Sequence, residues 1–187
     1  QSLVAEERTN IKLFNLGGGT GFVSAMLVEL GFEVFNLDID VTNESERNKK
    51  FDLNSDATLP YDSESFDYIL CQEVIEHIEN PWKLFRQIRG TLKKHGVLVL
   101  TTPNIQSLLS KEKFIQSGYY RWFTPDCFAY HINPLPKWEV ELIADRTGFI
   151  KKEILGNGEY YFAKGGKRLE REILDDNEAL IFIFEKK

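Results

Sequence analysis

An apolar strand pattern runs directly into a cluster of glycines in Leu13-Phe14-Asn15-Leu16-Gly17-Gly18-Gly19-Thr20-Gly21-Phe22. The glycines predict a tight turn in which the backbone can come close to a ligand, because glycine has no side chain to block the approach. A tight turn without a ligand is the alternative. A helix over 21–30 is expected to follow. Phe22 stands where the dinucleotide fingerprint GxGxxG needs its last glycine, so the spacing disfavours NAD.

A carboxylate follows the next expected strand, which spans 33–37 and ends at Asp38. In nucleotide-binding α/β folds, a carboxylate at the tip of the second strand accepts hydrogen bonds from both ribose hydroxyls. Asp38 is therefore the expected ribose ligand. The alternative is that it caps the following turn, a role that we assign preferentially to Asp40.

Short apolar runs alternate with helix-like stretches along the rest of the chain, which is typical of a sheet with helical crossovers. Further strands are expected at 50–53, 66–71, 97–100, 149–155 and 180–185. Pro81 is expected to open a helix after a cap at Asn80, and this helix is expected to stop at His95-Gly96. Another helix is expected over 137–147, and 156–177 is interpreted as a loop or hairpin without a function.

Composition indicates one globular domain over residues 1–187. The chain carries 23 Lys+Arg against 29 Asp+Glu, a net charge of −6, with 42% hydrophobic residues. This acidic balance argues against a nucleic-acid partner, and no apolar run approaches the roughly 18 residues of a membrane span. Cys71 and Cys127 cannot supply a disulfide framework or a four-ligand zinc site, so we expect a cytoplasmic protein without a metal.

Residues 104–136 interrupt the alternation with a concentration of aromatic side chains. We interpret this stretch as an insertion that forms a lid or a substrate wall. A small satellite core on the sheet edge is the equal alternative. The aromatic residues are Phe114, Tyr119, Tyr120, Trp122, Phe123, Phe128 and Tyr130.

Residues 14–38 resemble the nucleotide-binding half of class I S-adenosylmethionine-dependent methyltransferases, in the branch that uses small-molecule acceptors. The resemblance continues through 52–53, 59–61, 65–77 and 96–104, and a last match lies at 142–149. It implies a doubly wound, Rossmann-like α/β fold. The implied sheet has seven mostly parallel strands with the last one antiparallel, helices on both faces, and the cofactor at the carboxyl ends of the strands.

The resemblance also implies which residues hold S-adenosylmethionine. Gly17, Gly19 and Gly21 would lie against its methionine part, Asp38 would hold the ribose, Asp52 and Leu53 would contact the adenine, and Cys71 and Gln72 would line the sulfonium side. For Cys71 a small buried core residue is the equal alternative. The chain departs from the family at Asn15, where an acidic residue is usual, and in its first ten residues, which are too few for the usual covering helix.

Histidines are the first candidates for removing a proton from an acceptor. We prefer His131 as base or as the residue that orients the acceptor; His77 is the second candidate, although a structural hydrogen bond is the more common role at its position. His95 is set aside as a helix cap. Tyr119, Tyr120 and Arg121 of the insertion are plausible acceptor contacts.

The sequence therefore predicts an S-adenosylmethionine-dependent methyltransferase that acts on a small-molecule or glycan-like acceptor. A catalytically silent domain that serves as a binding module is the alternative. A nicotinamide-dependent oxidoreductase and a nucleic-acid methyltransferase are less favoured. The oligomeric state is not predicted.

Overall fold

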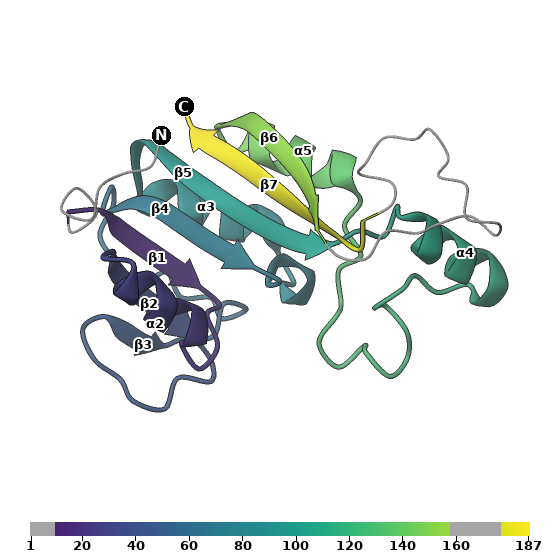
Figure 1. Cartoon of the computed structure of the whole chain (residues 1–187), viewed down its shortest axis with the longest axis horizontal. Coiled ribbons are helices and arrows are strands. Elements are labelled where there is room, and N and C mark those ends of the chain that lie inside the picture. The colour runs from purple at the N-terminus through teal and green to yellow at the C-terminus, as the bar shows by residue number, and fades with distance from the viewer. Residues whose placement is uncertain (1–9, 158–176) are drawn as a thin grey trace.

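A seven-stranded sheet organises the computed structural model, which describes residues 10–157 and 177–187 (Figure 1). The strands lie in the order β3-β2-β1-β4-β5-β7-β6. Neighbours from β3 to β5 are parallel, whereas β7 is antiparallel to both β5 and β6. The bounds are β1 (Lys12–Leu16), β2 (Glu33–Asp38), β3 (Asn48–Lys50), β4 (Phe66–Gln72), β5 (Leu92–Pro103), β6 (Phe149–Asn157) and β7 (Ala179–Lys186). The expected Rossmann-like α/β sheet with a reversed last strand is confirmed.

The register of the parallel strands brings three chain segments to one edge. Leu16 pairs with Leu37 on one side and with Cys71 on the other. The residues that follow these positions, among them Gly17 and Asp38, must therefore lie together at the carboxyl edge.

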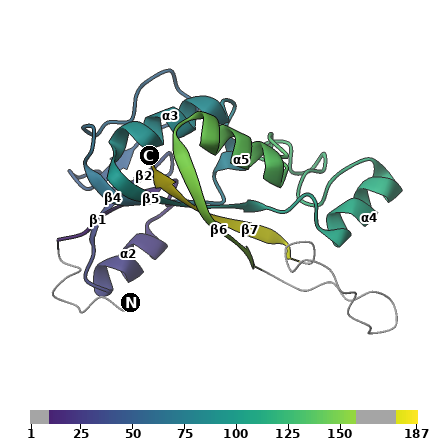
Figure 2. The same ribbon diagram turned by 90° about the horizontal axis from the view of Figure 1, so that it is seen from above.

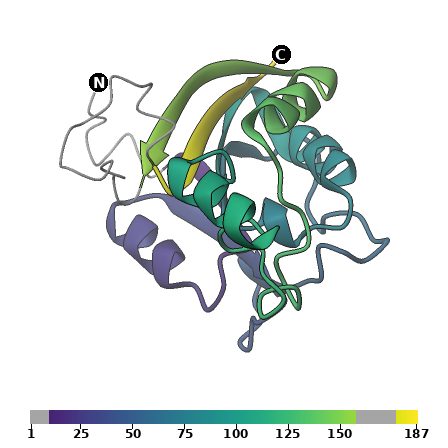
Figure 3. The same cartoon turned by 90° about the vertical axis from the view of Figure 1, so that its right-hand side faces the viewer.

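Helices cover both faces of the sheet, as expected. The helix α2 (Phe22–Glu29) lies on one face, while α3 (Pro81–Thr91) and α5 (Lys137–Arg146) lie on the other (Figures 2 and 3). The predicted cap of α3 is confirmed, because the side chain of Asn80 accepts a hydrogen bond from the backbone N–H of Lys83 at 2.9 Å. A 3-10 helix, η1 (Ile75–His77), follows β4, and α4 (Leu108–Ser117) lies within the aromatic insertion.

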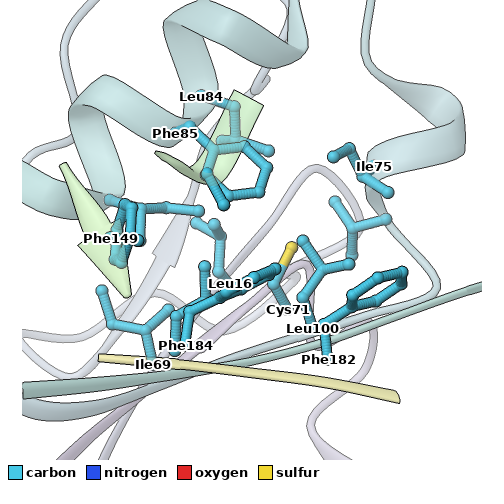
Figure 4. Packing of buried hydrophobic residues seen from close by; sticks show 14 of the residues in the cluster. Leu16, Ile69, Cys71, Ile75, Leu84, Phe85, Leu100, Phe149, Phe182 and Phe184 are labelled. Carbon is cyan, nitrogen blue, oxygen red and sulfur yellow. The ribbon is translucent and has the colours of Figure 1, made fainter. Parts of the chain in front are cut away.

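The hydrophobic core lies between the sheet and the face made by α3 and α5 (Figure 4). Phe85 of α3 packs edge-on against Phe149 and Phe184, with ring centroids 5.8 and 6.2 Å apart. All three rings have exposed fractions of 1% or less. This cluster packs β6 and β7 against α3 on the covered face of the sheet.

Some elements begin or end away from their expected positions. The helix α3 ends at Thr91, and Leu92 already pairs with Phe66 of β4, so β5 starts earlier than expected. His95 lies in this strand with φ 61° and contacts Glu185, so it does not cap a helix. The short strand β3 lies at Asn48–Lys50 instead of 50–53, and the expected loop or hairpin at 156–177 falls almost wholly outside the described residues.

Within residues 10–157 and 177–187, every helix is too short or too polar to cross a lipid bilayer.

Candidate functional site

The turn between β1 and α2 forms the floor of the site. Gly17, Gly19 and Gly21 all have positive φ, at 72°, 56° and 90°. A Cβ on Gly17 would overlap the side chain of Val74, so the backbone passes this neighbour only because the residue is glycine. At Gly19, apart from the glycine and its two chain neighbours, no atom of the described residues lies within 4 Å of the place that a Cβ would take. The turn is therefore tight on its inner side and open on its outer side.

Asp38 at the end of β2 closes the turn. Its Oδ2 accepts a hydrogen bond from the backbone N–H of Gly19 at 2.8 Å, and its Oδ1 accepts one from the N–H of Asp40 at 2.9 Å. Asp38, and not Asp40, thus caps the turn after the strand. Each carboxylate oxygen has further acceptor capacity, so both can still accept hydrogen bonds from a ligand such as a diol.

A cavity of about 590 Å³ opens at this edge of the sheet. Its volume lies within the roughly 300–1,000 Å³ of small-molecule sites. We name it the strand-end cavity, and its lining includes Gly17, Asp38, Asp52, Leu53, Glu73, Val74, His77, Tyr130 and Ile132. Three separate segments predicted from the sequence to hold a cofactor therefore meet in one place.

The remaining predicted cofactor contacts lie outside this lining. The backbone N–H of Gly19 donates to Asp38, which lines the strand-end cavity, whereas Gly21 is the residue before α2. Cys71 is fully buried in the core (Figure 4), which corresponds to the alternative stated for it. Burial raises the pKa of the Cys71 thiol above its usual range, and the nearby carboxylates of Glu76 and Glu73 raise it further.

Glu73 takes the place at the strand end that the sequence suggested for Gln72, which is exposed and does not line the strand-end cavity. Glu73 has φ 52°, an uncommon conformation for a residue with a side chain. Its Oε1 accepts a hydrogen bond from Thr101 Oγ1 at 2.5 Å. The sequence offered one signal for it, namely its position two residues after the expected strand over 66–71.

His77 and His131 lie against each other although 53 residues separate them in sequence. Their ring centroids are 4.8 Å apart. His77 Nδ1 is 2.9 Å from the carbonyl oxygen of Tyr130, and His131 Nδ1 is 2.6 Å from that of Trp122. A carbonyl only accepts, so Nδ1 carries a hydrogen in both rings, and in the neutral form of each ring the lone pair is on Nε2. Both predicted catalytic histidines thus have one fixed tautomer.

Glu76 lies behind the two histidines and is fully buried. Its Oε2 accepts a hydrogen bond from Thr102 Oγ1 at 3.2 Å, while Oε1 has no hydrogen-bond partner among residues 10–157 and 177–187. Burial raises the pKa of Glu76 to about 8, and the neighbouring Glu73 adds to the rise. The sequence pointed to His77 and not to Glu76, because the side chain of Glu76 is buried beside Thr102, which lies 26 residues further along the chain.

The aromatic insertion is attached to this region through its backbone. The carbonyl oxygen of Glu76 accepts hydrogen bonds from the N–H groups of Ile132 at 2.9 Å and Asn133 at 3.0 Å. The side-chain amide of Asn133 also donates to the carbonyl oxygen of Ile78. Residues 131–133 are thereby fixed beside the strand-end cavity.

A second cavity, of about 440 Å³, lies on the other side of this attachment. We name it the aromatic cavity, and it is lined by Phe114, Gly118, Tyr119, Tyr120, Phe123, Phe128, His131, Ile132 and Pro134. Phe114 and Tyr120 stack with centroids 4.6 Å apart. Ile132 lines both cavities, so they adjoin at the contact between His77 and His131.

Arg121 is not part of the aromatic cavity, unlike Tyr119 and Tyr120. Its guanidinium pairs with Glu178 at 2.6 Å and lies 5.1 Å from the ring centroid of Trp122. The structure therefore separates it from the two tyrosines with which the sequence grouped it.

Asn15 belongs to a buried polar chain beneath the glycine turn. Its Nδ2 donates to Ser24 Oγ at 2.9 Å, and Ser24 Oγ donates to Asn36 Oδ1 at 3.1 Å. Asn36 Nδ2 in turn donates to Asn48 Oδ1 at 2.9 Å. The chain links β1, α2, β2 and β3, so Asn15 holds the turn in place from below.

The sequence matches a known family and several curated proteins. Residues 1–151 match the family described as methyltransferase domain. The ubiquinone biosynthesis O-methyltransferase of Glaesserella parasuis is 33% identical over 103 residues, which cover 41% of this chain and 44% of that protein. The protein of the same name from Pelagibacter ubique is 29% identical over 103 residues, covering 51% of this chain and 43% of that protein. The chain thus spans less than half the length of these relatives.

Solved structures share the fold. An S-adenosylmethionine-dependent methyltransferase from Archaeoglobus fulgidus superposes with a TM-score of 0.64 at 19% identity, over 94% of this chain and 86% of that one. One from Mesorhizobium loti gives a TM-score of 0.63 at 16% identity, over 94% and 91% of the two chains.

Proposed function

Because this chain belongs to the methyltransferase-domain family, we propose that it transfers a methyl group from S-adenosylmethionine to a small-molecule acceptor. One observation carries the proposal: the strand-end cavity and the aromatic cavity adjoin at the contact between His77 and His131. A cofactor and an acceptor held in these two places would meet beside two imidazoles.

The residues of the strand-end cavity fit the cofactor. Both oxygens of Asp38 can accept hydrogen bonds from the ribose hydroxyls, and the turn next to the cavity leaves room for a close ligand at Gly19. The carboxylate of Asp52, beside the apolar Leu53, can accept from the exocyclic amine of adenine. When bound there, S-adenosylmethionine supplies a methyl group activated by its sulfonium.

The chain itself would contribute alignment and proton removal. As a hydroxyl acceptor forms its bond to the methyl carbon, the carbon–sulfur bond breaks and the hydroxyl proton must leave. The Nε2 lone pair of His131 or His77 can take this proton, and such assistance contributes typically about 10² to 10⁴ in rate. Alignment of the two reactants contributes on the order of 7–11 kcal/mol when it is fully achieved.

The aromatic cavity favours an acceptor with a flat, apolar ring. Its stacked and edge-on rings, such as Phe114 on Tyr120, offer the surfaces on which another ring packs. The names of the curated relatives agree with a hydroxyl acceptor of this kind. A glycan-like acceptor ranks second, because its many hydroxyls need more polar partners than this lining offers.

Two measurements test the proposal. Calorimetric titration with S-adenosylhomocysteine should show saturable binding, whereas NADH should not bind. Methyl transfer from labelled S-adenosylmethionine should then be measured on a panel of ring hydroxyl compounds, sugars and an oligonucleotide. Turnover of ring hydroxyls that falls in Tyr120→Ala through a raised KM supports the proposal. Binding without turnover on the whole panel would favour the silent module, and no binding by a folded protein would refute the proposal.

A further inference from the structure

Two chain segments line the strand-end cavity at the place expected for adenine. One is the loop after β3, which carries Asp52 and Leu53, and the other is η1 with Ile78, the residue that follows it. A base held between these segments needs a fixed spacing, because hydrogen bonds form only over a narrow range of distances, about 2.7–3.2 Å.

Asn54 joins the two segments through its side chain. Its Nδ2 donates to the backbone carbonyl oxygen of His77 at 3.0 Å, and its Oδ1 accepts from the backbone N–H of Glu79 at 2.9 Å. A carboxylate could make only the second bond, because it cannot donate. The carboxamide of Asn54 therefore sets the distance between the loop and η1.

The backbone of Asn54 also holds the carboxylate that we expect to contact the adenine. Its N–H donates to Asp52 Oδ1 at 2.9 Å. Ser55 Oγ donates to the backbone carbonyl oxygen of Asp52 at 2.6 Å and closes the turn. Asp52 is exposed, so its carboxylate keeps acceptor capacity for an exocyclic amine. A single residue thus connects this carboxylate to η1.

Other attachments of the loop lie outside the cavity. Lys83 Nζ donates to the carbonyl oxygen of Ser55 at 2.6 Å, and Gln87 Nε2 donates to that of Ala57 at 3.1 Å. Both donors belong to α3, and neither lines the strand-end cavity, whereas Asn54 does. These two bonds hold the loop on α3, while the bonds of Asn54 hold it on η1.

We propose that Asn54 is a positioning residue that makes the site selective for adenine, an inference that rests on the proposed function. By fixing the spacing between Asp52 and η1, it holds the carboxylate where the exocyclic amine of adenine arrives. Hypoxanthine carries a carbonyl oxygen at that place, so it would set one acceptor against another. A carboxylate that is held in position rejects such a base, whereas a mobile one turns away from it.

The test compares S-adenosylhomocysteine with S-inosylhomocysteine, which differ only in the base, by calorimetric titration. The wild type should bind the adenine compound about 10-fold more tightly or more, the value of one hydrogen bond to a charged group. Asn54→Ala should weaken its binding by about 5- to 30-fold, because two hydrogen bonds are lost and water replaces them in part. The ratio of the two affinities should fall by about threefold or more, whereas a merely structural role would weaken both compounds equally.

A double-mutant cycle shows whether Asn54 acts through Asp52. Asp52→Ala should remove the preference for adenine, and Asn54→Ala added to it should change the ratio of affinities no further. Additive changes in this ratio would overturn the inference, because Asn54 would then act independently of the carboxylate.

Gln87→Ala is the matched control. It also deletes a side-chain amide that donates to a carbonyl oxygen of the same loop, but outside the cavity. Both affinities should stay within about twofold of the wild type, as for most surface substitutions. If Gln87→Ala lowers the ratio as much as Asn54→Ala does, general loosening of the loop explains the effect and the role of Asn54 is refuted. Far-ultraviolet circular dichroism confirms that each variant is folded.

Failure of this inference can be separated from failure of the proposed function. If the wild type binds both compounds equally, or if Asn54→Ala keeps the wild-type ratio, the cofactor site stands and only the role of Asn54 is wrong. If S-adenosylhomocysteine does not bind to the folded wild type, the proposed function is refuted and the role of Asn54 with it.

Discussion

Asp38 allows the sharpest test of the cofactor site, because its carboxylate has two separable roles. Within the protein it accepts hydrogen bonds from the backbone of Gly19 and Asp40. Toward a cofactor it would accept two more, from the ribose hydroxyls. Replacing it therefore changes both the stability of the free protein and the affinity for S-adenosylhomocysteine, by different amounts.

The expected losses follow from the number of bonds. Two hydrogen bonds to a charged group at about 1.5–3 kcal/mol each give about 3–6 kcal/mol of binding free energy. At about 1.4 kcal/mol per factor of ten, Asp38→Ala should weaken binding by about 10² to 10⁴. Asp38→Asn keeps one acceptor oxygen, so it should lose about 10- to 100-fold.

The stability of the free protein should fall by less than the binding free energy. The bond from Gly19 is only partly buried and the bond from Asp40 is exposed, so water can replace the lost acceptor. We expect Asp38→Ala to lower the free energy of unfolding by about 1–2 kcal/mol. Urea denaturation measures this change without ligand, and calorimetry measures the affinity.

Asp40→Ala is the matched control. Asp40 lines the same cavity and carries the same charge, but its backbone N–H, not its carboxylate, bonds to Asp38. It should leave affinity within about threefold. If both alanine variants weaken binding equally, the affinity depends only on the negative charge at this edge of the sheet. If Asp38→Ala binds like the wild type, the ribose assignment is refuted.

Three further substitutions test the surroundings of the site. Gly17→Ala adds a Cβ that overlaps Val74, at a residue whose φ is 72°. It should therefore destabilise the fold by about 1–3 kcal/mol and weaken S-adenosylhomocysteine binding. A wild-type melting temperature would contradict this. Asn15→Asp removes the donor to Ser24 and buries a charge, so the free energy of unfolding in urea should fall by about 1–3 kcal/mol, although the family usually carries an acid at this position. Unchanged stability would disprove the polar chain. Phe85→Ala should cost about 3–5 kcal/mol with ligand affinity retained below the melting temperature, and a selective loss of affinity would contradict a purely structural role.

Local patterns predicted those parts of the fold that local interactions determine. The glycine turn, the cap at Asn80 and the acid at position 38 each depend on a few neighbouring residues. The end of α3 does not, because the apolar spacing of the helix continues to Leu92. Pairing of Leu92 with Phe66 in β4 overrides this pattern and starts the strand early.

The site was only partly predictable for a similar reason. Whether Cys71 points into the core or toward a ligand depends on the parity of its strand, which the sequence leaves open. The contact between His77 and His131 requires the insertion to return to η1, and no local pattern encodes that return. The helix α4 was also not predicted, because it lies within the segment that we interpreted as an aromatic insertion.

The attachment of the insertion to Glu76 has a consequence for how chains with this fold diversify. The bonds from the backbone N–H groups of Ile132 and Asn133 use main-chain atoms, so they persist under almost any exchange of side chains except to proline. The rings of the aromatic cavity can therefore be altered by selection or by a protein engineer while the segment keeps its anchorage. If the proposed function holds, recognition of the acceptor and recognition of the nucleoside are separately heritable traits of a single chain.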